Sequence, residues 1–191
     1  MARFFTELAY NGSGFHGWQK QKNAITVQQT VEQVLTTLFQ ETIEVTGAGR
    51  TDTGVHAAYF VAHFDSRGLP FDENVVCNKA NSMLPPGIAI YSFTPVDAEA
   101  HCRFDAVART YEYHLVLHKD PFLNGLTHRP WFRPDFDTMN LAAQKLKDYE
   151  DFTSFARLYG GNKTNFCKID EAYWEQRGSR YVFVIRANRF L

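Results

Sequence analysis

The pattern that most limits the fold of this chain is a period-two alternation of side chains over residues 109–117. Odd-numbered positions there form one face and even-numbered positions the other, as successive side chains of a β-strand do. Shorter strand patterns are predicted at 3–10, 42–46, 59–64, 88–93, 169–174 and 181–187. The last two are predicted to form a hairpin that turns at 177–179.

Three helices are predicted between these strands. The first opens at Thr26, because Thr26 and Gln29 have the spacing of a capping box. Apolar residues at three-to-four spacing form its buried stripe: Val27, Val31, Val34, Leu35 and Leu38. The other two span about 73–84, where Pro85-Pro86-Gly87 ends the helix, and 138–149.

Strands separated by single helices and by hairpins indicate the α+β class with mainly antiparallel sheets, rather than a parallel doubly wound sheet. The chain has 191 residues, a length that suits one domain or two small ones with a buried core. Two halves are predicted, 1–100 and 101–191, each with strands and one or two helices.

Composition limits the class of protein further. The sequence has no run of about 18 apolar residues and no signal-peptide pattern at its N-terminus, so no membrane partner is expected. Cys77, Cys102 and Cys167 are widely spaced, which is typical of reduced thiols in a cytoplasmic protein. The net charge of -1 means that any RNA contact must come from a local basic surface.

Two patterns are typical of cofactor or metal sites but lack the context such sites need. Residues 12–17 fit G-x-G-x-x-G, yet a dinucleotide site needs a helix at the last glycine, and none is predicted before Thr26. A glycine-rich turn beside a packed Trp18 is the better interpretation. The seven histidines include no H-E-x-x-H pair, and adjacent His101 and Cys102 are poorly spaced for one metal. We expect no cofactor and no metal.

Residues 52–54 read D-T-G, which is also the motif of aspartic proteases. Those enzymes hold two aspartates close enough to share a proton, on a largely β scaffold. Only one copy of the motif occurs here, so a dimer would be required. Arg50 nearby also favours an ionised carboxylate over a shared proton. The dimeric aspartic protease stays the rival enzyme hypothesis.

The loop at 47–57 is the strongest candidate site. Glycines on both sides let its backbone bend and approach a ligand closely, and it presents Arg50, Asp52 and His56 together. From spacing alone, an Asx-type turn in which Asp52 caps its own backbone is an equally good interpretation.

Residues 49–57 read G-R-T-D-T-G-V-H-A, which resembles the signature of the TruA-type tRNA pseudouridine synthase family. Five further segments resemble motifs of that family in the same order, at 10–19, 26–28, 60–65, 109–113 and 151–155. Together they cover nearly the whole chain. The resemblance implies a pseudouridine synthase fold, in which two α/β halves with mainly antiparallel sheets flank a central cleft.

The resemblance also implies an activity, the isomerisation of uridine to pseudouridine in the anticodon arm of tRNA, at tRNA positions 38 to 40. It implies Asp52 as the nucleophile, attacking either ribose C1′ or base C6, without a cofactor. The partner is tRNA, and the complete protein is expected to be a homodimer.

Two further residues receive roles from the resemblance. Tyr111 is similar to the family tyrosine that stacks on the target base. From the residues alone, a core aromatic on a strand is the alternative for Tyr111. Arg50 is expected to contact the RNA backbone or to fill the gap that the flipped base leaves. Weaker candidates for phosphate contacts are Lys20, Arg103, Arg109 and Lys163, although single surface cations are more often solvated charges.

The chain departs from the family pattern at its end. TruA-type enzymes continue beyond 188–191 with a helix that carries an M-V-R motif, whose arginine is implied to pair with the nucleophile. We therefore expect a C-terminally truncated chain with weak activity or none. The alternative to an active enzyme is therefore a catalytically impaired fragment that still binds RNA.

Overall fold

The computed structural model describes residues 1–156 and 164–191, and these form two compact units. Unit 1 is Met1–Ala106 and unit 2 is Val107–Leu191. The expected boundary lay at 100, but the segment that follows it folds with unit 1. Cys102 explains this, because its thiol lies 3.1 Å from the Thr46 carbonyl oxygen and 3.1 Å from His63 Nδ1.

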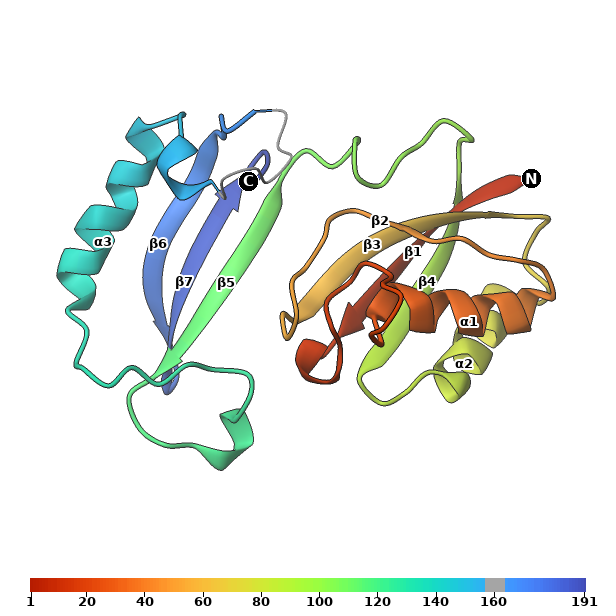
Figure 1. Ribbon diagram of the computed structural model, residues 1–191, viewed down its shortest axis with the longest axis horizontal. Coiled ribbons are helices and arrows are strands. Elements are labelled where there is room, and N and C mark those ends of the chain that lie inside the picture. Colours follow the sequence, from red (N-terminus) through yellow and green to blue (C-terminus); the bar gives the residue numbers. More distant parts are fainter. Residues whose placement is uncertain (157–163) are drawn as a thin grey trace. The chain divides into compact units, whose positions relative to one another are not determined.

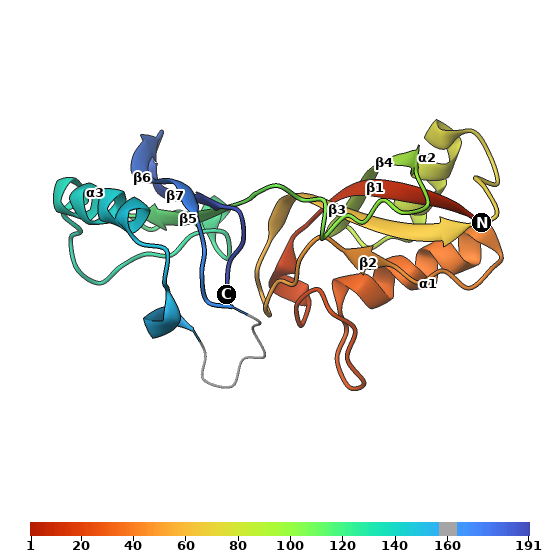
Figure 2. The same cartoon turned by 90° about the horizontal axis from the view of Figure 1, so that it is seen from above.

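Unit 1 contains a four-stranded antiparallel sheet in the order β2 (Thr46–Gly47), β3 (Ala57–Ser66), β1 (Ala2–Tyr10) and β4 (Ile88–Val96). From Phe4 to Tyr10, the even-numbered side chains of β1 are buried, which is the expected alternation of a strand with one covered face. Phe4, Leu8 and Tyr10 share one hydrophobic core with residues of α1 (Val27–Phe39) and α2 (Glu73–Met83). Figure 1 shows both helices on the lower side of this sheet, and the turned view in Figure 2 separates them.

Helix α1 begins where its sequence predicts. Thr26 is the N-cap, and its Oγ1 accepts a hydrogen bond from the Gln29 N–H at 3.3 Å. The predicted stripe is buried at Val27, Val31, Val34 and Leu35, and Leu38 packs against the same core while partly exposed. Helix α2 begins after Asp72 and ends one residue before Leu84, ahead of the two prolines.

The strand predicted at 42–46 is wrong over most of its length, because only Thr46 pairs with β3. Side chains of α1 accept the backbone N–H groups that a sheet would otherwise pair. Thr36 Oγ1 accepts from Ile43 at 3.0 Å, and Glu32 Oε1 accepts from Val45 at 3.1 Å. Both amides are therefore satisfied without a partner strand, and the segment that leads to the candidate loop lies against α1.

Unit 2 contains a three-stranded antiparallel sheet in the order β5 (Arg109–Val116), β7 (Arg180–Ala187) and β6 (Ile169–Arg177). The predicted hairpin of β6 and β7 is confirmed, and Gly178 adopts the left-handed φ of +62° in its turn. Helix α3 (Phe136–Lys145) starts before the predicted residue 138, because Asp135 Oδ1 accepts from the N–H groups of Asp137 and Thr138, each at 3.2 Å.

Helix α3 lies alongside the edge strand β6 (Figure 1). Short 3₁₀ segments complete the described chain, at Gly12–Gly14, Pro121–Leu123, Leu146–Asp148 and Thr153–Phe155. Each unit thus combines helices with an antiparallel sheet, as expected for the α+β class. Within the described residues, none of the helices has the length and apolar character needed to cross a bilayer.

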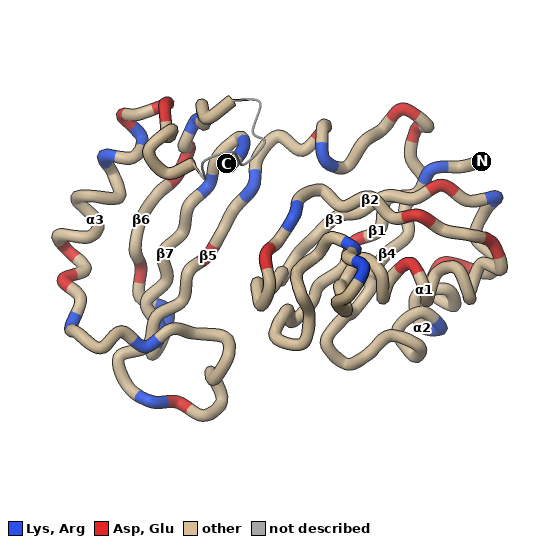
Figure 3. Tube along the Cα trace, viewed as in Figure 1, with Lys and Arg blue, Asp and Glu red and all other residues tan. Residues whose placement is uncertain are grey.

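Charged residues of both signs are distributed along both units, and blue and red segments alternate over the trace in Figure 3. The near-zero net charge of the chain therefore comes from nearly equal numbers of both signs, mixed along the sequence. Attraction to an anionic partner must depend on a few cations in a defined place.

Candidate active site

The candidate loop joins β2 to β3 in unit 1. Its first residue continues the pairing of the two strands, since the Ala48 N–H donates to the Val61 carbonyl oxygen at 2.8 Å. A turn then forms over 52–55, in which the Val55 N–H donates to the Asp52 carbonyl oxygen at 3.1 Å. Gly54 adopts a φ of +79° inside this turn. The loop is thus a long hairpin connection with a tight turn at Asp52.

The segment after β1 holds this loop in place. The Tyr10 hydroxyl and Thr51 Oγ1 are 2.9 Å apart, and the Trp18 N–H donates to the Thr51 carbonyl oxygen at 3.0 Å. At the far end of the loop, the Gly12 N–H donates to His56 Nδ1 at 3.1 Å. The backbone on both sides of Asp52 is therefore fixed by residues about 40 positions earlier in the chain.

Two glycines of the G-x-G-x-x-G pattern are required by this contact. A Cβ on Gly12 would lie 2.1 Å from the Val55 carbonyl oxygen, and a Cβ on Gly17 would lie 2.5 Å from that of Thr51. Gly17 also has a φ of +80°. Trp18 is only 2% exposed and packs 4.3 Å from the Phe60 ring. The predicted glycine-rich turn beside a packed tryptophan is confirmed, and its glycines serve the approach of the candidate loop.

Asp52 itself is exposed at the tip of this fixed loop. The turn at 52–55 uses the backbone carbonyl oxygen of Asp52, and among the described residues no backbone N–H donates to its carboxylate, as an Asx-type turn would require. Within the described residues, the Asp52 carboxylate has no hydrogen bond or ion pair. The structure therefore presents a carboxylate to solvent on a rigid backbone, and its catalytic role stays a prediction.

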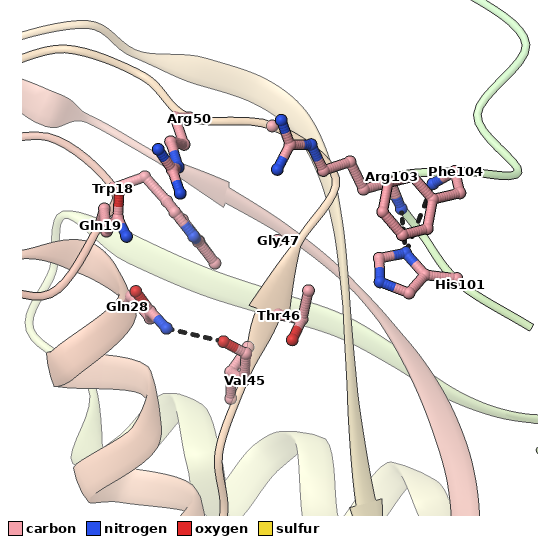
Figure 4. Close-up of a pocket in the computed structure, with 11 residues that line it drawn as sticks. Trp18, Gln19, Gln28, Val45, Thr46, Gly47, Arg50, His101, Arg103 and Phe104 are labelled. Atoms are coloured by element: carbon pink, nitrogen blue, oxygen red, sulfur yellow. Dashed lines mark hydrogen bonds between the residues drawn. The ribbon is translucent and has the colours of Figure 1, made fainter. Parts of the chain in front are cut away.

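Two predicted RNA-contacting cations lie together in unit 1. Arg50 and Arg103 both line a pocket of about 230 Å³, and Figure 4 shows them on the same side of it, above Trp18 and Gly47. Lys20 has a different setting, because its Nζ lies 2.7 Å from Glu32 Oε2. The hydrogen bond to this carboxylate raises the pKa of Lys20. The Lys20 charge is thus already balanced inside the protein.

Unit 2 carries the other predicted residues. Tyr111 lies on β5 and is 40% exposed, so it is not a core aromatic, and its ring meets Phe190 edge-on at 4.9 Å. Arg109 Nη1 donates to the Asn188 carbonyl oxygen at 3.3 Å. Lys163 lies outside the described residues. The predicted site residues therefore come from both units: Lys20, Arg50, Asp52 and Arg103 from unit 1, and Arg109 and Tyr111 from unit 2.

Sequence reasoning missed the residues that position the loop. Tyr10 and His56 were part of matched motifs, but only the fold shows that they hold the backbone around Asp52. Gln28 was also missed, and its Nε2 donates to the Val45 carbonyl oxygen at 2.8 Å. A polar side chain in the first turn of a helix carries no spacing signal for such a contact.

A cluster of potential metal ligands also lies in unit 1, formed by His63, His101 and Cys102, whose ligand atoms lie within 4.8 Å of one another. Sequence spacing did not foresee it, because β3 supplies His63 from far away in the chain. His101 Nδ1 accepts from the N–H groups of Arg103 and Phe104 at 3.2 and 3.4 Å. A metal-bound histidine normally donates its other ring N–H instead. The cluster is a hydrogen-bonded one.

Comparison with known proteins gives the class to which this arrangement belongs. The family model described as "tRNA pseudouridine synthase" matches residues 8–105, which lie within unit 1 and include the whole candidate loop. A "tRNA pseudouridine synthase A" from Parabacteroides distasonis is 48% identical over 191 residues, which are 100% of this chain and 76% of the relative. Relatives of the same name from Porphyromonas gingivalis (49%) and Thiobacillus denitrificans (40%) also align with all of this chain and with 77% and 74% of their own lengths.

The chain belongs to the tRNA pseudouridine synthase family. It is therefore a member of a family of isomerases, as its motifs predicted.

Proposed function

We propose that this chain isomerises uridine to pseudouridine in the anticodon arm of tRNA, at tRNA positions 38 to 40, with Asp52 as the nucleophile. Family membership supports tRNA as the substrate and uridine isomerisation as the reaction. The observation that carries the role of Asp52 is its geometry. Its carboxylate is exposed and lies on a loop whose backbone is fixed by Tyr10, Trp18 and Gly12.

The proposed reaction needs an ionised carboxylate and no oxidation or hydrolysis. The carboxylate attacks either ribose C1′ or base C6, and the bond between N1 and C1′ breaks. The uracil then rotates, and C5 bonds to C1′. The bond to the Asp52 carboxylate breaks, the C5 proton is lost and N1 gains one, so that the carboxylate is regenerated. Asp52 is exposed on the candidate loop, two residues from Arg50, where a nucleotide can approach its carboxylate.

Two neighbouring roles belong to the same proposal. Tyr111 offers an exposed aromatic face on β5 on which an extruded base can stack. We expect Tyr111→Ala to weaken tRNA binding by about 5- to 150-fold and Tyr111→Phe to bind like wild type, since stacking needs only the ring. If Tyr111→Ala binds tRNA as tightly as wild type, Tyr111 does not stack on the base. Arg50 is proposed to contact the RNA backbone or to fill the space left by the flipped base.

The test of the nucleophile uses tRNA tritiated at uridine C5 and measures the tritium released. Wild type should release label, and Asp52→Asn should release none while it still binds tRNA. Asp97→Asn is the matched control, because Asp97 is an exposed aspartate of unit 1 outside the candidate loop. Release by Asp52→Asn at the wild-type rate would disprove the role of Asp52. If wild type binds tRNA but releases no tritium, the hypothesis of an RNA-binding fragment is favoured. The aspartic protease hypothesis predicts instead that the protein cleaves peptides at acid pH.

We also propose a homodimer. Unit 2 exposes large aromatic side chains, with Phe122 91% and Trp131 95% exposed, and such side chains are enriched in protein interfaces. Light scattering coupled to size exclusion should give twice the chain mass of 22.0 kDa. A monomer at all concentrations would rule the dimer out.

A further inference from the structure

The pocket of about 230 Å³ in unit 1 is not explained by the attack of Asp52 on uridine. Asp52 does not line it. One wall is the Trp18 ring, which packs so closely that a Cβ on Gly47 would lie 2.6 Å from it. The pocket is smaller than the roughly 300–1,000 Å³ of ordinary small-molecule sites, so it suits a fragment of a larger ligand.

The charge of the pocket selects an anion. Among the described residues that line it, Arg50 and Arg103 are the ones with a permanent charge, and none is an aspartate or a glutamate. Figure 4 shows both guanidinium groups on the same side of the pocket. Glu32 of α1 does not line the pocket, and its carboxylate is paired with Lys20 and also accepts from Gln28 Nε2 and the Val45 N–H. Planar guanidinium groups are well suited to bind a phosphate.

The lining of the pocket also offers an aromatic platform. Phe104 is 76% exposed, yet its ring stacks on His101 at 4.1 Å with an interplanar angle of 29°. The position of His101 is itself fixed by hydrogen bonds. Its ring Nδ1 accepts from the backbone N–H groups of Arg103 and Phe104, and its backbone N–H donates to Asp105 Oδ2 at 2.7 Å. An exposed ring that is fixed in this way is pre-organised to stack on a base.

We propose that this pocket binds a second nucleotide of the tRNA, with its phosphate on Arg103 and its base stacked on Phe104. The inference rests on the proposed function and deepens it. Arg50 is two residues from Asp52, and two residues of chain reach at most about 7 Å, so one RNA strand can contact both places. The bound nucleotide is a neighbour of the uridine that reacts, and it sets the register of the RNA on the loop.

The test measures tRNA affinity at several salt concentrations for Phe104→Ala and Arg103→Gln. Phe104→Ala should bind about 5- to 150-fold more weakly with an unchanged salt slope, and Phe104→Tyr should restore binding. Arg103→Gln should reduce the slope of log K against log salt by about 0.7 to 0.9, the value of one phosphate contact. Phe104→Ala thus changes the affinity alone, whereas Arg103→Gln also changes how the affinity depends on salt.

Matched controls come from the far side of unit 1. Tyr91→Ala removes an exposed aromatic on β4, at the opposite edge of the sheet from β2. Arg67→Gln removes an exposed arginine that pairs with Glu41, beyond the C-terminal end of α1, whereas Gln28 at the N-terminal end lines the pocket. Both controls should bind tRNA like wild type.

Anticodon-arm hairpins with one abasic nucleotide each identify the stacked base. An abasic nucleotide at one position next to the reacting uridine should weaken binding to wild type. It should not weaken binding to Phe104→Ala, because the variant has already lost the contact with that base. If wild type binds and modifies tRNA while Phe104→Ala and Arg103→Gln match the controls, the second-nucleotide site is disproved and the proposed function stands. If wild type binds no tRNA, the second-nucleotide site and the proposed function are both disproved.

Discussion

Gly12 and Gly14 stand in the same short 3₁₀ segment but have very different surroundings. A Cβ on Gly12 would meet the Val55 carbonyl oxygen at 2.1 Å, whereas a Cβ on Gly14 would meet nothing within 4 Å. The oxygen belongs to the turn that begins at Asp52, so it cannot move away without moving the candidate loop. At position 12, glycine has a hydrogen atom where alanine has a methyl group. Only the hydrogen atom leaves room for the segment after β1 to approach the candidate loop.

Gly12→Ala is therefore expected to lower the free energy of unfolding by about 1–3 kcal/mol, the usual cost of overpacking, and to reduce pseudouridine formation at least tenfold. Gly14→Ala should change neither quantity. Urea unfolding and tritium release measure both. Full activity of Gly12→Ala would show that the loop contact is not needed for the reaction.

The motifs at 10–19 and 49–57 could be identified from the sequence, and so could the turn beside Trp18. Their contact could not. The bond between Tyr10 and Thr51 joins residues 41 positions apart, and it depends on how β1 and β3 are paired rather than on local spacing.

Helix α3 protects the edge strand β6 in an unusual way. Asn140 Nδ2 donates to the Trp174 carbonyl oxygen at 2.9 Å, and Asn140 Oδ1 accepts from the Trp174 N–H at 2.6 Å. One turn later, Gln144 Nε2 donates to the Ala172 carbonyl oxygen at 3.1 Å. These side chains satisfy backbone groups that an edge strand would otherwise offer to another chain.

Replacing Asn140 by Ala should cost unit 2 about 1–3 kcal/mol of stability, because it leaves part-buried backbone groups unpaired. Hydrogen exchange at the Trp174 amide should become faster. Leu141→Ala is the control on the same helix, since Leu141 is 70% exposed and makes no such bond. An unchanged exchange rate in Asn140→Ala would contradict the protective role of α3.

Period-two and three-to-four spacing predicted most helices and strands near their observed bounds, since both patterns reflect which face of an element is buried. The prediction failed at 42–46. There Ile43 and Val45 have the β-branched, buried character of a strand, but Thr36 and Glu32 accept their N–H groups. A local pattern cannot show that a helix provides hydrogen bonds in place of a strand.

The stability of the protein as a whole should respond to acid in two stages. Burial lowers the pKa of His63 from its ordinary 6.5, so the folded state resists a proton that the unfolded state accepts. Stability is therefore lost as the pH falls below about 6.5, towards the lowered pKa of the folded state. Hydrogen bonds from Arg3 and Thr153 lower the pKa values of Asp65 and Asp151, and their contribution is lost only below about pH 4.

His63→Gln should remove the first stage and leave the second, because glutamine keeps an acceptor near the Cys102 N–H without titrating. Thermal unfolding midpoints between pH 8 and 3 measure both stages. If wild type and His63→Gln lose stability in parallel between pH 7 and 5, the first stage does not come from His63.

The sequence alone determined the α+β class, the positions of most elements, the family and the loop that carries Asp52. Those properties depend on residues close together in the chain, whose spacing reflects local backbone geometry. Only the tertiary structure decided what surrounds the loop. It brought His63 to Cys102, placed Arg50 and Arg103 in one pocket, and fitted Gly12 against Val55. These contacts follow from strand pairing and close packing across the chain, which no local pattern encodes.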